Sequence, residues 1–190
     1  MKRQLLLVTA ALILPLIGCD QAESKPSPSG ALELAAAEDV IDAFYSWNPV
    51  ELKTALSVAS QIAPDQVDRA LYYQAWAKAG NYVIQTRRSC ESMQDSVIGC
   101  AITVTDDIGG ALGYVATDTF LLTVMDHQIV GIDSTADDPP VLQEVFDWIA
   151  RTRPDVMSGP CRDLFAGGTT PAECVREVVQ AAQDYMEVVK

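Results

Sequence analysis

The chain has 190 residues, with 13 Lys or Arg, 26 Asp or Glu and one His, which gives a formal net charge of −13 at pH 7. This length is enough for one domain with a hydrophobic core. A strongly acidic protein repels phosphate backbones and anionic head groups, so nucleic acid is not an expected partner. A cationic partner or ligand stays open, although many acidic surfaces serve only solubility.

Residues 1–18 are typical of a bacterial lipoprotein signal peptide. Two basic residues precede an uncharged apolar run, Leu5–Ile17, and the sequence Leu-Ile-Gly-Cys that ends at Cys19 resembles a lipobox. The resemblance implies cleavage before Cys19 and acylation of its thiol, with palmitate among the chains, which together anchor a protein stably. An ordinary signal peptide cut elsewhere is the alternative. The apolar run is shorter than the roughly 20 residues of a spanning helix.

The signal peptide and the residues after its cleavage site predict where the protein is located. We expect it to be anchored in the cell envelope and to face the periplasm or the cell exterior. Asp20 resembles the inner-membrane retention signal of enterobacteria-like Gram-negative cells and so favours that membrane. Residues 19–30 are rich in Pro and Ser and lack an apolar pattern, which predicts a flexible tether after the acylated cysteine.

Three helices are predicted after the tether. The apolar residues of 40–47 recur at helical spacing on one face. Asn48-Pro49 is typical of a stop followed by a new start, since Asn caps helices and Pro suits their first position. A third helix is expected to begin near Pro64 and to end at Gly80.

From Asn81 the apolar pattern changes to a period of two, which is typical of strands. Segments around 82–87, 97–104, 119–124 and 130–132 show this alternation, and glycines or Asp126-His127 separate them. The pattern predicts an antiparallel meander of four strands. His127 is interpreted as a turn residue rather than a base or ligand.

The chain beyond the strands is predicted to be helical. Asp138-Pro139-Pro140 is expected to cap one helix, and Thr170–Glu173 has the pattern of a capping box for the last one. We therefore interpret 31–138 as an α+β domain and 139–190 as a helical extension of the same domain.

The four cysteines besides Cys19 predict two disulfides in an oxidising compartment. Of three possible connectivities we favour Cys90–Cys100 and Cys161–Cys174. A hairpin that turns near Asp95 places the first pair opposite each other, and the second pair would fix a glycine-containing loop to the last helix. Free buried thiols are the alternative. The sequence has no Cys-x-x-Cys pair, so no zinc site is expected.

The hairpin register has a further consequence for Arg88. It directs this side chain to the inner face of the sheet, where an unpaired charge is costly. Either a bulge turns Arg88 outward, or Arg88 pairs with an acid such as Asp106.

Three helices followed by an antiparallel meander resemble the nuclear transport factor 2-like (SnoaL-like) superfamily. The resemblance rests on Val40–Leu56, with its helix–Asn-Pro–helix start, and on Asp118–Asp133, which is similar to the late hairpin of that family. It covers roughly residues 35–138 and implies a cone-shaped α+β fold in which a curved sheet encloses a pocket. The family contains isomerases, dehydratases, binding proteins and interaction modules, so the fold does not select a function.

Six aromatic residues are candidates to line such a pocket, although aromatic residues at helical spacing more often belong to a core. They are Phe44, Tyr45, Trp47, Tyr72, Trp76 and Phe120. Enzymes of the family use pocket acids, and alternation places Asp118 on the face of Phe120, so Asp118 is the candidate general base, with Tyr45 or Tyr72 as oxyanion donor. The favoured interpretation is that Asp118 is solvated at the open start of its strand.

The sequence contains no nucleophile elbow, phosphate loop or metal motif. We therefore expect no cofactor, no metal and a non-catalytic, lipid-anchored domain that binds a small apolar ligand or another envelope protein. One alternative is a pocket enzyme of isomerase or dehydratase type that uses Asp118. A second is a structural module that forms homodimers through Val97 and Leu121 on the outer face of the sheet.

Overall fold

The computed structural model describes residues 28–58, 62–94, 96–166 and 168–189. The predicted signal peptide, Cys19 and Asp20 lie outside these residues. The first helix already begins at Pro28, so the last three residues assigned to the tether are helical. Among the described residues, no helix has the length and apolar character that crossing a membrane requires.

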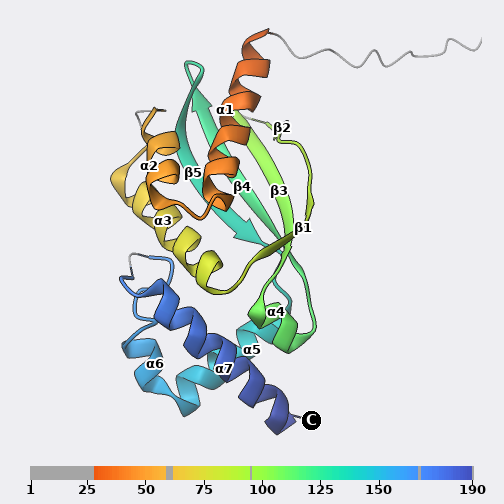
Figure 1. Ribbon diagram of the computed structural model, residues 1–190, viewed down its shortest axis with the longest axis vertical. Helices are drawn as coiled ribbons and strands as arrows, with labels where there is room; N and C mark the ends of the chain where they lie inside the picture. The colour runs from red at the N-terminus through yellow and green to blue at the C-terminus, as the bar shows by residue number, and fades with distance from the viewer. Residues whose placement is uncertain (1–27, 59–61, 95, 167, 190) are drawn as a thin grey trace, which may run out of the picture.

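Helices precede, interrupt and follow an antiparallel sheet, so the protein is of the α+β class (Figure 1). The helices are α1 (Pro28–Tyr45), α2 (Pro49–Val58), α3 (Pro64–Ala79), α4 (Asp107–Leu112), α5 (Pro140–Thr152), α6 (Pro154–Ser158) and α7 (Pro171–Val189). The strands are β1 (Val83–Arg87), β2 (Glu91–Ser92), β3 (Val97–Thr105), β4 (Ala116–Met125) and β5 (Gln128–Ala136).

The described strands form one five-stranded sheet of order β1-β3-β4-β5, in which the short β2 also pairs with β3. The prediction of four strands was therefore wrong by one. The predicted first strand is β1, and the additional strand is β2, which lies beyond the predicted segment and pairs with β3 from Glu91. Because Arg87 pairs with Ile102 and Glu91 with Gly99, this edge holds one residue more than β3 between the two pairs, and the exposed Arg88 lies in this irregularity. The bulge, rather than an acidic partner, is what the structure contains.

Two hydrophobic clusters hold the molecule together. In the first, α1, α2 and α3 cover the inner face of the sheet, with Phe44 and Leu52 packed near Phe120 and Leu122. In the second, α4, α5, α6 and α7 pack around the end of α3, which contributes Trp76. The helix α3 thus belongs to both layers and connects the sheet with the C-terminal helices (Figure 1).

Both favoured disulfides are present, with Cα atoms 4.3 Å apart in Cys90–Cys100 and 4.7 Å apart in Cys161–Cys174. The predicted turn centre Asp95 lies outside the described residues, but the pairing of Glu91 with Gly99 agrees with the predicted register. Two such bridges indicate an oxidising environment.

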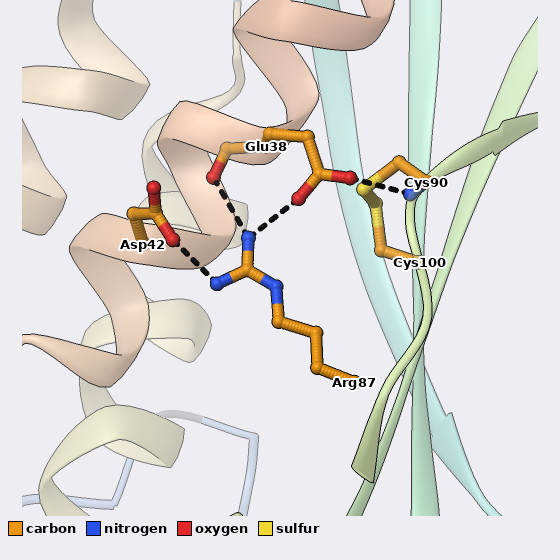
Figure 2. Close-up of a disulfide and its surroundings, with 5 residues drawn as sticks. All are labelled: Glu38, Asp42, Arg87, Cys90 and Cys100. Atoms are coloured by element: carbon orange, nitrogen blue, oxygen red, sulfur yellow. Dashed lines mark hydrogen bonds and ion pairs between the residues drawn. A yellow bond between two sulfur atoms is a disulfide. The ribbon is translucent and has the colours of Figure 1, made fainter.

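A charged contact beside the first disulfide fixes α1 to the edge of the sheet (Figure 2). The guanidinium of Arg87 donates to Asp42 and, at 2.5 Å, to Glu38 Oε2. The other carboxylate oxygen of Glu38 accepts the backbone N–H of Cys90 at 2.5 Å. At the C-terminal end of α1, the buried side-chain amide of Gln74 donates to the carbonyl of Phe44 at 2.8 Å. This bond satisfies a carbonyl in the last turn of the helix.

The starts of two helices and the presence of a third helix, α4, differ from the predictions. Asp138 does not cap α5, because Pro139 occupies the N-cap position and no side chain bonds there. The hydroxyl of Thr170 donates to the carbonyl of Pro160 at 2.9 Å, whereas the predicted capping box would bring it to the N–H of Glu173. The helix α4 was expected to be a connection, because two of its six residues are glycines. Asp106 caps it by accepting the N–H of Gly109 at 2.6 Å.

Candidate functional site

A cavity of about 410 Å³ lies where the sheet layer meets the C-terminal helices. It is bounded by α3, by the residues around α4, by the end of β5, by α5 and by the loop before α7. Seven of its nineteen lining residues are aromatic, namely Tyr73, Trp76, Tyr82, Tyr114, Phe120, Phe146 and Phe165. A cavity of this size and character is typical of a site for a small organic molecule.

The structure divides the six predicted pocket residues into two groups. Trp76 and Phe120 line the cavity. The other four do not, and they lie in the core that supports it: Phe44 is 4.8 Å from Phe120 between ring centroids, Tyr45 contacts Asp118, Trp47 is 5.5 Å from Tyr45, and Tyr72 is 5.6 Å from Phe165. The Tyr72 hydroxyl is buried without a hydrogen-bond partner among the described residues.

The loop that carries Phe165 closes one side of the cavity. The ring of Phe165 lies 5.7 Å from Tyr73 and 5.1 Å from Trp76 between centroids, although 40% of the residue is exposed. Its φ of 57° is unusual for a bulky side chain. The loop is held by the disulfide Cys161–Cys174 and by a close contact of Gly168, where a Cβ would lie 2.8 Å from the ring of Tyr72.

Asp118 is only 1% exposed, so the interpretation of a solvated strand end was wrong. Its strand β4 is central, and Asp118 lies between Ile102 and Ala136 of the neighbouring strands. The hydroxyl of Tyr45 donates to Asp118 Oδ2 over 3.4 Å, and α1 thereby covers the carboxylate. Alternation along a strand assigns a face to a residue, but it does not show that a helix will cover it.

Burial raises the pKa of Asp118 to about 6, while hydrogen bonds from Tyr73 and Tyr45 act in the opposite direction. Burial is also the main cause that raises the pKa of Tyr73 and of Tyr82, and a hydrogen bond joins these two hydroxyls. Asp118 itself is not part of the cavity wall, whereas Tyr73 and Tyr82 are. The carboxylate therefore accepts a hydrogen bond from one wall residue, Tyr73, which in turn is hydrogen-bonded to Tyr82.

The cavity wall also contains carboxylates that the sequence analysis did not assign to a site. Asp106, Asp133 and Asp138 line it together with one cation, Arg69. Burial raises the pKa of Asp106 to about 6, and the charge of Asp138 raises it further against a hydrogen bond from Gly109. No local pattern could have found this group, because Asp106 caps α4 and Asp138 follows β5 far along the chain.

The structure also bears on His127 and on metal binding. His127 lies in the β4–β5 turn, as predicted, and its Nδ1 is 2.6 Å from Glu33 Oε1. Among the residues that the structure describes, no three His, Cys, Asp or Glu side chains are arranged to hold a metal ion.

The Asp118→Asn variant is expected to change how stability depends on pH. Because the pKa of Asp118 in the folded protein, about 6, exceeds its ordinary value of 3.8, the folded state binds more protons between these values. Ionisation therefore destabilises the fold as the pH rises, and asparagine removes this cost while still accepting a tyrosine hydrogen bond. The variant should gain about 2–3 kcal/mol over the natural protein between about pH 4 and about pH 7.

Urea unfolding at several pH values measures this difference. Asp39→Asn, on the exposed face of α1, is the matched control. Its free energy of unfolding should differ from that of the natural protein by the same amount at every pH. A stability difference between Asp118→Asn and the natural protein that does not vary with pH would contradict the prediction.

A comparison with protein-family models finds no match to the chain, and a comparison with curated protein sequences finds no significant match either.

Proposed function

We propose that the chain is a lipid-anchored extracytoplasmic protein whose nuclear transport factor 2-like domain binds a small organic molecule without catalysing a reaction. The observation that carries the proposal is the aromatic-walled cavity of about 410 Å³. Burial of a ligand against such walls supplies the binding free energy, and the few polar groups of the wall orient it.

The anchor is supported by the lipobox that ends at Cys19 and by the two disulfides, which agree with an oxidising compartment. Mass spectrometry of the protein extracted from membranes tests it. A mature chain that begins with an acylated Cys19 is expected, and an unmodified thiol at this position would rule the anchor out.

The family assignment is supported by the order and packing of the elements. Three helices precede an antiparallel meander and cover its inner face, which is the arrangement that the resemblance implies. The cavity lies at one end of this face, and the C-terminal helices add Leu142, Phe146 and Phe165 to its wall.

Binding is favoured over the two other functions considered. The isomerase or dehydratase hypothesis needs Asp118 to reach a substrate, but this residue is 1% exposed and is not among those that line the cavity. The dimer hypothesis needs an apolar outer face, but Thr119 and Thr123 flank Leu121 on that face of β4.

Fluorescence of the neutral probe N-phenyl-1-naphthylamine tests the proposal. Saturable binding to one site is expected, and the larger side chain in Ala70→Phe, which fills part of the cavity from α3, should weaken it about tenfold. The control Ala150→Phe adds the same ring to the exposed side of α5 and should bind the probe like the natural protein. Absence of binding, or equal affinity in both variants, would contradict a ligand site in this cavity.

A further inference from the structure

The carboxylates of the cavity wall are not paired with a cation. Asp106 lies before α4, whereas Asp133 and Asp138 lie in β5 and just after it, and none of the three forms an ion pair with another described residue. Two of them are held in place locally, since Asp106 accepts from Gly109 at 2.6 Å and Asp133 from Ser134 at 2.8 Å. The wall therefore presents negative charge at positions that are half-buried for Asp106 and exposed for Asp133 and Asp138.

The single cation of the wall does not neutralise this charge. Arg69 lies near the exposed side of α3, where 45% of its side chain is accessible, and its guanidinium is 3.8 Å from Asp65. Three carboxylates and one guanidinium leave an excess of negative charge, within a chain that is itself strongly acidic. This field attracts cations and repels anions.

The aromatic part of the wall has the same electrostatic preference. The faces of Trp and Tyr rings carry the negative end of the ring quadrupole, and they attract a cation that lies within roughly 6 Å of the ring centre. Trp76, Tyr73, Tyr82 and Tyr114 are the Trp and Tyr residues of the wall. A purely apolar ligand would form no favourable contact with the carboxylates. Its binding would remove water from them at a cost in free energy.

We propose that the ligand of this cavity is an organic cation, with a quaternary or protonated ammonium group near Asp106 and Asp138 and an apolar body against the aromatic wall. This inference depends on the proposed binding function and specifies the chemical class of the ligand. The ammonium group of the ligand takes the place of the counterion that the wall carboxylates lack. The aromatic rings contact both the charged and the apolar part of the ligand.

A pair of isosteric probes and an anion test the inference through competition with N-phenyl-1-naphthylamine near pH 7. They are 4-hydroxyphenyltrimethylammonium, its neutral carbon isostere 4-tert-butylphenol, and the anion 4-hydroxybenzoate. The cation is expected to bind at least about tenfold more tightly than the neutral isostere, and the anion more weakly than both.

The double variant Asp106→Asn/Asp138→Asn should reduce the preference for the cation to about twofold or less, while binding of 4-tert-butylphenol changes little. Asp68→Asn, an exposed acid of α3 outside the cavity, is the control for net charge and should keep the full preference. Circular dichroism and binding of the neutral probe show that the variants are folded.

The outcomes separate this inference from the function on which it rests. If N-phenyl-1-naphthylamine and 4-tert-butylphenol bind but the cation is not preferred, the ligand class is wrong and the binding site stands. A preference for 4-hydroxybenzoate would assign the cavity to anions through Arg69 and overturn the inference. If no probe binds, both the site and the ligand class are refuted.

Discussion

The Phe120→Ala variant is expected to lose about 3–5 kcal/mol of unfolding free energy, which is the usual cost of deleting a buried aromatic side chain. Phe120 is 1% exposed and belongs to the hydrophobic cluster between α1–α3 and the sheet. Its ring centroid lies 4.8 Å from Phe44 of α1 and 6.1 Å from Tyr73 of α3. The substitution removes these contacts together with one wall of the cavity, so probe binding should also weaken.

Urea unfolding measures the loss, and Phe165→Ala is the matched control. Phe165 lines the same cavity but is 40% exposed, so its removal should cost less than about 1 kcal/mol while it still weakens probe binding. Equal stability losses in the two variants would show that Phe120 is not the centre of the core.

Replacing Cys161 and Cys174 together by Ala is expected to lower the unfolding free energy by about 3 kcal/mol. The bridge closes a loop with a sequence separation of 13 residues, and its loss increases the conformational freedom of the unfolded chain. The same loop carries Phe165, so the folded variant should also bind N-phenyl-1-naphthylamine several-fold more weakly.

The other disulfide provides the control for this second effect. Replacing Cys90 and Cys100 by Ala should cost a similar amount of stability, because the separation of 10 residues is similar. Neither cysteine lies in the cavity wall, so the affinity of the folded variant for the probe should be unchanged. Equal losses of affinity in the two double variants would show that the Phe165 loop does not depend on its bridge.

Local patterns predicted most of the elements and both disulfides. Proline at the start of α2, α3 and α7 and the alternation of β3, β4 and β5 are properties of neighbouring residues, so they can be read without the fold. The helix α4 was missed because glycines are poor helix formers. It forms because Asp106 caps it and because Ile108, 2% exposed, is buried against the C-terminal helices.

The candidate site was less predictable, because it is made by tertiary contacts. The helix α5 was predicted, but its sequence does not show whether a side chain such as Phe146 fills a core or lines a cavity. Asp118 was assigned to the inner face correctly, and its burial depends on Tyr45 of a helix 73 residues away. Asp106 was considered only as a possible partner of Arg88 and Asp138 only as part of a helix cap, and the fold brings both to one wall.

The direction of α1 determines where the cavity stands in relation to an anchored N-terminus. The helix has 18 residues, a rise of about 27 Å. It begins at the end of the molecule opposite the C-terminal helices, and it ends at Tyr45, beside the carboxylate that supports the cavity wall (Figure 1). If Cys19 carries the proposed anchor, the anchored segment joins the described structure at the end remote from the cavity, and we then expect the proposed ligand to be captured from the aqueous space rather than from the bilayer.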